Sequence, residues 1–256
     1  MFVLWLSQAS NAKGQHLRDF VGLARDWSAC LEPLQPGALA DLDAFEGELE
    51  CAGSLLITFP DVVVHEPWRS AVVQAVRDGK RCLVIAPDTE LNRFLFEFDL
   101  AVHTGRLVAP AGSMGDERLV EVLGAEQPVH PLAQQLLRPQ AILGAERPSQ
   151  VWCGAGAQPF LVAPAGTRLL GADDLFQPVP PGPLCCGGLW PRADVPPQEA
   201  PLATGAGLVL VANTCLFDPT ARTVHSQRMQ GLERLSNDMV CWLLGKRPWQ
   251  PAATRA

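Results

Sequence analysis

The sequence lacks tyrosine, has no C-x-x-C cysteine pair and carries charge on only 18% of its residues. Without paired spacing, its cysteines do not form a recognisable set of zinc ligands, and we expect no metal and no cofactor. We interpret them as reduced thiols of the core in a cytoplasmic protein. The eight cysteines are Cys30, Cys51, Cys82, Cys153, Cys185, Cys186, Cys215 and Cys241.

Long apolar runs and a basic surplus are also missing. No segment reaches the roughly 18 to 20 apolar residues that a membrane helix needs. The apolar start MFVLWL follows no basic residues and is shorter than a signal peptide requires. The net charge is −7 and the basic residues are scattered, which argues against a nucleic-acid-binding surface. We therefore expect a cytoplasmic protein without direct membrane insertion and without a nucleic-acid partner.

What the first hundred residues do contain is a regular alternation of apolar and amphipathic segments. Short apolar runs predict strands at Phe2–Leu6, Cys30–Leu34, Ser54–Phe59 and Cys82–Ala86. Helical spacing predicts helices over His16–Trp27, residues 38–50, Pro67–Gly79 and Glu90–Phe98. This alternation indicates an α/β fold, a three-layer sandwich with a mainly parallel, flavodoxin-like (doubly wound) sheet.

The remaining sequence is less regular. Strands are expected around Trp152 and at Phe160–Ala163 and Gly207–Asn213, and a closing helix from Ser226 to Leu244. Residues 177–206, rich in proline and glycine, are predicted to be a surface loop, with Cys185-Cys186 as incidental thiols within it. Residues 246–256 are expected to be a frayed tail. We expect residues 1–256 to form a single α/β domain.

Three stretches carry a family resemblance. They are SLLITFP…WRSAVVQAVRDGKRCLVIAP, the His130-Pro131 turn, and GLVLVANTCLF with a later helix that ends Trp242-Leu243-Leu244-Gly245. In this order they resemble the class I glutamine amidotransferase-like superfamily. The chain looks most like its non-catalytic branch, found in gliding-motility transport auxiliary proteins and at the N-terminus of an intraflagellar transport subunit. The resemblance implies a binding or scaffold subunit of a multi-protein assembly, with protein partners that could include an ATP-driven machine.

The same resemblance allows a test for catalysis. Catalytic members carry a nucleophilic cysteine in a Gly-x-Cys-x-Gly turn after a central strand, and a late His-x-Glu. Here the turn after Cys82–Ala86 reads Ala86-Pro87-Asp88, and His225 is followed by serine and glutamine. The catalytic residues of the family therefore cannot be carried over, and we expect a protein that is not an enzyme.

Two alternatives stay open. A cysteine hydrolase or amidotransferase could use a relocated nucleophile, either Cys215, with Asp218 and His225 nearby in sequence, or Cys153. Cys153 precedes Gly154-Ala155-Gly156, whose N–H groups could form an oxyanion site. A small-ligand sensor is the other alternative.

Ligands of open parallel sheets gather at the carboxyl ends of the strands, so binding residues are sought there. Polar loops follow the first, third and fourth expected strands, and a helix N-terminus after the first could hold an anion. Solvated loops are the plain alternative. The predicted ligand or partner crevice consists of Gln8, Asn11, Lys13, His16, Pro60, Asp61, Pro87, Asp88 and Thr89.

Overall fold

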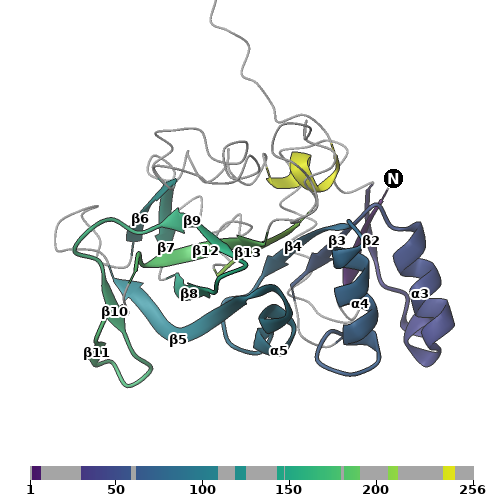
Figure 1. The fold of residues 1–256 in the computed structure, drawn as a ribbon, viewed down its shortest axis with the longest axis horizontal. Helices are drawn as coiled ribbons and strands as arrows, with labels where there is room; N and C mark the ends of the chain where they lie inside the picture. Colours follow the sequence, from purple (N-terminus) through teal and green to yellow (C-terminus); the bar gives the residue numbers. More distant parts are fainter. Residues whose placement is uncertain are drawn as a thin grey trace, which may run out of the picture.

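Strands from both halves of the chain meet in one large sheet, and helices pack beside its parallel end. The computed structural model describes residues 2–6, 30–58, 62–108, 119–124, 143–146, 148–179, 182–190, 207–212 and 239–245. In Figure 1 the helices and the parallel strands occupy one end of the molecule, and the antiparallel strands occupy the other.

The large sheet has nine strands in the order β2-β1-β3-β4-β13-β12-β9-β6-β7. Their bounds in that order are Leu31–Pro33, Val3–Leu6, Ser54–Ile57, Arg81–Ile85, Leu208–Val211, Cys185–Trp190, Gln158–Val162, Leu119–Gly124 and Leu143–Glu146. The first five strands are parallel, and the remaining pairings are antiparallel. The predicted parallel sheet is confirmed for this first half, whereas the antiparallel half was not expected.

A second sheet of four antiparallel strands has the order β11-β10-β5-β8. The bounds in that order are Phe176–Gln177, Arg168–Leu170, Leu100–Val108 and Ser149–Cys153. The sequence predicted strand structure around Trp152, whereas no strand was predicted where the nine-residue β5 lies. The protein is therefore α/β, with a parallel central sheet region and an added antiparallel sheet.

Helices α3 (Leu42–Cys51) and α4 (Trp68–Arg77) are the longer helices of the described chain. The Asp41 side chain accepts a hydrogen bond from the Asp43 N–H and so caps α3. Gly79 follows α4 with φ of 114°, which glycine adopts without strain. The other helical segments are η2 (Pro36–Ala40), α5 (Asn92–Leu95), η3 (Phe96–Phe98) and the helical residues 239–243.

The β3-α4-β4 unit matches the sequence prediction closely. β3 and β4 are adjacent, parallel and fully buried. The buried side of α4 consists of Val72, Val73 and Val76, which recur at helical spacing. Burying each such side chain contributes about 1.5–3 kcal/mol, so local periodicity and tertiary burial favour the same structure here.

One sequence prediction is wrong within the Pro/Gly-rich segment. Residues 185–190 are not part of a surface loop but form β12, which is buried between β13 and β9. Gly187 and Gly188 allow this placement: a Cβ at Gly187 would lie 2.7 Å from Leu161 Cδ1, and one at Gly188 would lie 2.6 Å from Leu100 Cδ2. The glycines that suggested a loop instead permit close packing of strands.

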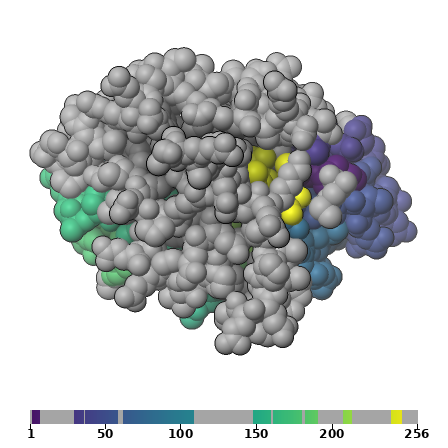
Figure 2. All heavy atoms as spheres, turned by 90° about the horizontal axis from the view of Figure 1, so that it is seen from above, coloured from purple at the N-terminus to yellow at the C-terminus, as the bar shows by residue number. Residues whose placement is uncertain are grey.

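Arg81 joins the parallel sheet to the last helical segment. Its side chain is buried, and Nη1 donates a hydrogen bond to the Trp242 carbonyl oxygen over 2.6 Å. A cation at a helix C-terminus is favoured by the helix dipole. Figures 1 and 2 both place residues 239–245 beside the N-terminal half of the molecule. No helix within the described ranges is long and apolar enough to cross a membrane.

Candidate functional site

The turn after β4 lies at the carboxyl edge of the parallel strands, where the sequence predicts a crevice. Ala86 donates its N–H to Val211 of β13, so the turn begins directly at the end of the paired strands. Pro87, Asp88 and Thr89 follow, and all three are exposed. These three residues of the predicted crevice therefore lie together at the expected edge. The other six lie outside the described residues: Gln8, Asn11, Lys13, His16, Pro60 and Asp61.

Hydrogen bonds show that the polar groups of this turn hold the backbone. The Ser149 hydroxyl donates to the Pro87 carbonyl oxygen over 2.6 Å and ties the turn to β8. Asp88 Oδ1 accepts a hydrogen bond from the Glu90 N–H over 3.1 Å, an Asx turn that leads into α5. The Thr89 carbonyl oxygen accepts from the Asn92 N–H. The turn is thus an exposed rim whose backbone is held by hydrogen bonds, and it contains no cysteine.

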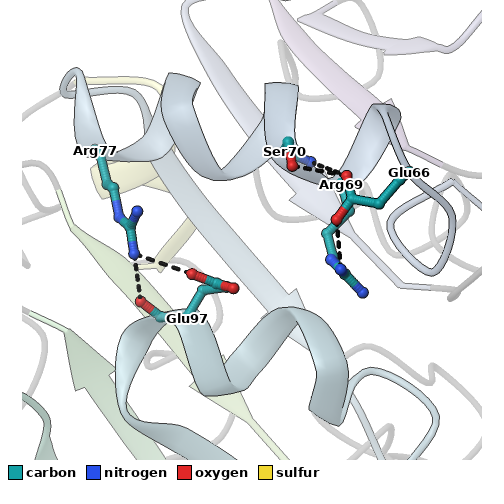
Figure 3. A network of polar contacts seen from close by, with 5 residues as sticks. All are labelled: Glu66, Arg69, Ser70, Arg77 and Glu97. Carbon is teal, nitrogen blue, oxygen red and sulfur yellow. Dashed lines mark hydrogen bonds and ion pairs between the residues drawn. The ribbon is translucent and has the colours of Figure 1, made fainter.

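The N-terminus of α4 is covered by a polar network at the surface (Figure 3). Glu66 Oε2 accepts hydrogen bonds from the Ser70 hydroxyl over 2.7 Å and the Ser70 N–H over 3.2 Å, and its other oxygen pairs with Arg69. The Ser70 hydroxyl, more than the nearby guanidinium, lowers the pKa of Glu66. A carboxylate of the chain itself thus occupies the place where this helix end could bind an anion.

A second ion pair in Figure 3 joins the other end of α4 to η3. Arg77 Nη2 lies 3.1 Å from Glu97 Oε2 and donates to the Glu97 carbonyl oxygen over 3.2 Å. Both side chains are nearly half exposed, so the pair contributes little to stability. Its arrangement is structural and includes no potential nucleophile.

The turn after Cys153 does not have the free donors of an oxyanion site. Gly154 donates its N–H to the Asp99 carbonyl oxygen over 2.7 Å, and Gly156 donates to Asp99 Oδ2 over 3.0 Å. A Cβ at Gly156 would lie 2.3 Å from that carboxylate oxygen. Asp99 therefore uses the two glycine N–H groups that a catalytic Cys153 would need, and a carboxylate beside them would repel an oxyanion. Cys215, the other proposed nucleophile, lies outside the described residues.

The cysteines of β4 and β12 are buried and hold their protons tightly. Burial raises the pKa of the Cys82 thiol well above its usual value and that of Cys186 to about 12. The pKa of Cys185 is raised as well, chiefly by its hydrogen bond with the Cys153 thiol, and its Sγ donates to the Val151 carbonyl oxygen over 3.2 Å. The prediction that Cys185 and Cys186 belong to a flexible loop is therefore wrong. These thiols are packing groups, since the thiolate is the reactive form.

Sequence reasoning missed the exposed apolar surface of the second sheet. Leu175, Phe176 and Val179 are each more than half exposed at β11 and beside it. The only sequence signal was the placement of apolar residues directly after the turn residues Asp173 and Asp174. Within the described ranges, no cluster of three or more histidine, cysteine, aspartate or glutamate side chains could hold a metal ion.

Comparison with known proteins gives a likeness in structure but not in sequence. No protein-family model matches the chain, and no curated protein sequence does. Nine chains among the solved structures match it. One of these is the structure described as "mmIFT52 N-terminal domain", with a TM-score of 0.59 and 10% sequence identity. The match covers 95% of this chain and 97% of that domain, so the two share a fold over nearly their whole length.

Proposed function

We propose that this chain is a non-catalytic binding or scaffold subunit of a multi-protein assembly. The observation that carries this proposal is the turn after β4. It stands at the usual ligand-binding edge of a parallel sheet, yet its side chains are proline, aspartate and threonine, and hydrogen bonds hold its backbone. An exposed rim without a cysteine suits contact with a partner better than covalent chemistry.

Two further observations support the proposal. The fold is shared with the mmIFT52 N-terminal domain, which agrees with the intraflagellar transport part of the sequence resemblance. The buried thiols of β4 and β12 are also unsuited to nucleophilic chemistry. In this proposal the chain is a single cytoplasmic domain, a flavodoxin-like, amidotransferase-like three-layer sandwich. Its partners are proteins, including an ATP-driven machine.

The proposed contact rim can be tested by reversing charge on it. The double variant Asp88→Arg, Thr89→Arg is expected to abolish binding of a partner that co-purifies with the tagged full chain. The two arginines would repel a cationic partner surface, and their bulk would disrupt a closely fitted one. The control is Glu46→Arg on the exposed side of α3, which should retain the partner. Size-exclusion chromatography of the native complex is the measurement. A wild-type chain that never migrates with a partner would count against the scaffold function itself.

The relocated-nucleophile alternative makes a different prediction for thiol chemistry. An activated cysteine reacts with iodoacetamide faster than a free thiol at neutral pH. We expect Cys82 and Cys186 to react at least about a thousandfold more slowly than glutathione in the folded protein, because so little of each thiol is ionised. The exposed Cys51 is the internal reference. Mass spectrometry of labelled peptides would support the enzyme alternative only if Cys153 or Cys215 reacted faster than glutathione.

A further inference from the structure

The β10–β11 hairpin presents apolar side chains to solvent at the free end of the second sheet. Leu175 is 66% exposed, Phe176 52% and Val179 51%. Figure 1 shows the hairpin projecting at the end of the molecule opposite α3 and α4. Three large apolar side chains this close together in sequence are costly to leave in water, and such patches mark interaction sites.

Strand register assigns the side chains to two faces of this sheet. Arg106, Leu170 and Phe176 are directly opposed across β5, β10 and β11, so they share one face. Leu107 and Leu169 oppose each other on the other face, and both are buried. The face that contains Phe176 is therefore the outer face of the sheet.

This outer face is also basic. Arg168, two residues before Leu170, points to the same side, and its guanidinium carbon lies 3.7 Å from the centre of the Phe176 ring. Arg106 and Arg168 are exposed, and neither pairs with a carboxylate among the described residues. Two arginines without a carboxylate partner in the described part of the chain form a local site for an acidic group on a protein of net charge −7.

Neither acidic residue of the hairpin turn, Asp173 or Asp174, forms an ion pair with these arginines among the described residues. Asp173 Oδ1 accepts a hydrogen bond from the Leu175 N–H over 3.2 Å. A Cβ at Gly171 would lie 2.6 Å from that oxygen and 2.4 Å from Gln177 Nε2. Gln177 opposes Leu169 on the inner face, so the Asp173 carboxylate lies on that side as well, away from the arginines.

Among the described strands, β11 stands at one end of the four-stranded sheet. β11 pairs with β10 on one side and ends the four-stranded sheet, with no other described strand on its second side. β11 is two residues long and Pro178 follows it, so an added strand would make few main-chain hydrogen bonds. Such a strand would be held mainly by the alternate side chains that it places on one face.

We propose that an extended acidic segment of a partner protein adds to β11 as a fifth strand. On the outer face its apolar side chains would contact Phe176 and its carboxylates would lie at Arg168, while Arg106, farther away on the same face, adds positive charge. This inference rests on the proposed function as a binding subunit, for which it names the chemistry of a partner. A second copy of this chain fits the edge less well, because a symmetric pair would bring the same arginines of both copies to one interface.

Three synthetic nonapeptides test the proposal on the isolated full chain by fluorescence polarisation. One has valine and glutamate in turn at every second position with serine between them (VSESVSESV), so that both kinds of side chain lie on one face of the strand. The second has lysine in place of glutamate, and the third is the glutamate peptide with proline in place of its second and third serines. We expect the first to bind saturably below about 1 mM and the other two at least about tenfold more weakly. Raising the salt concentration from 0.05 M to 0.5 M should weaken the first interaction, since exposed charges are screened. Equal binding of the three peptides, or no binding at about 1 mM, would overturn the proposal.

Variants locate the binding on the hairpin. The double variant Leu175→Ser, Phe176→Ser is expected to lower the affinity for the glutamate peptide by at least about tenfold, because it removes central apolar side chains of the interface. Arg106→Gln with Arg168→Gln should remove the preference for glutamate over lysine. The matched control is Phe96→Ser, which changes another exposed aromatic residue, in η3, and should leave binding unchanged. Because all these side chains are exposed, circular dichroism should show each variant folded.

Two outcomes separate this proposal from the scaffold function. A native partner that remains bound to the Leu175→Ser, Phe176→Ser variant would contradict the proposal that partners dock at β11, but it would not contradict the scaffold function. A wild-type chain that dimerises in sedimentation experiments, and loses the dimer in that variant, would identify a second copy as the occupant and overturn the choice of partner.

Discussion

Phe98→Ala is expected to lower the free energy of unfolding by about 3–5 kcal/mol, the range for removing a fully buried phenylalanine side chain. Phe98 has no exposed surface and lies between two aromatic rings, with centroids 5.2 Å from both Phe94 and Trp190. Trp190 ends β12, so the ring of Phe98 joins the helical segment after β4 to the glycine-rich strand. Loss of the ring would leave a cavity exactly where these two segments meet.

The neighbouring Phe96 supplies a matched control within η3. Its side chain is 59% exposed, so Phe96→Ala should change stability by no more than about 0.5 kcal/mol. Urea unfolding followed by tryptophan fluorescence and by far-ultraviolet circular dichroism measures both variants. Equal stability losses in the two variants would show that the aromatic contact does not hold β12 against the core.

The sequence predicts the β3-α4-β4 unit well because its signals are local. Short apolar strands, the valines of α4 and the turn glycine Gly79 all indicate the same structure within about 30 residues, the size of a βαβ unit. β12 shows the opposite case. Gly187 and Gly188 are ordinary loop signals in sequence, and their role as close-packing positions depends on Leu161 and Leu100, which lie far away in the chain.

The candidate site likewise has one feature that the sequence predicts and one that depends on long-range strand pairing. The position of Pro87, Asp88 and Thr89 at the end of a parallel strand follows from strand order alone, and the structure places them there. The role of Asp99, which binds the glycine N–H groups after Cys153, depends on the pairing of β5 with β8. Long-range register of this kind leaves no mark in a single sequence, so an oxyanion site looked plausible where a structural carboxylate stands.

Alkaline pH is expected to destabilise the protein strongly. In the folded state the pKa of Cys186 is about 12 and that of Cys82 is higher still, whereas an unfolded cysteine titrates near 8.5. Above that value the unfolded chain loses protons that the folded chain keeps, so stability is fully present below about pH 8.5 and falls as the pH rises toward the folded pKa values. The loss is about 1.4 kcal/mol per pH unit for each thiol whose folded pKa lies above the pH, and Cys185, whose pKa is also raised, adds to it.

Single substitutions separate the contributions of Cys82 and Cys186 from those of the six other cysteines. The chain has no tyrosine and only three lysines, so the group that usually dominates alkaline titration near pH 10 is missing. Cys186→Ala should reduce the slope of unfolding free energy against pH by about 1.4 kcal/mol per unit between pH 9 and 11. Urea unfolding at several pH values gives these slopes. An unchanged slope in Cys186→Ala would mean that the Cys186 thiol reaches solvent in the native state. The interpretation of the β12 cysteines as purely structural would then be wrong.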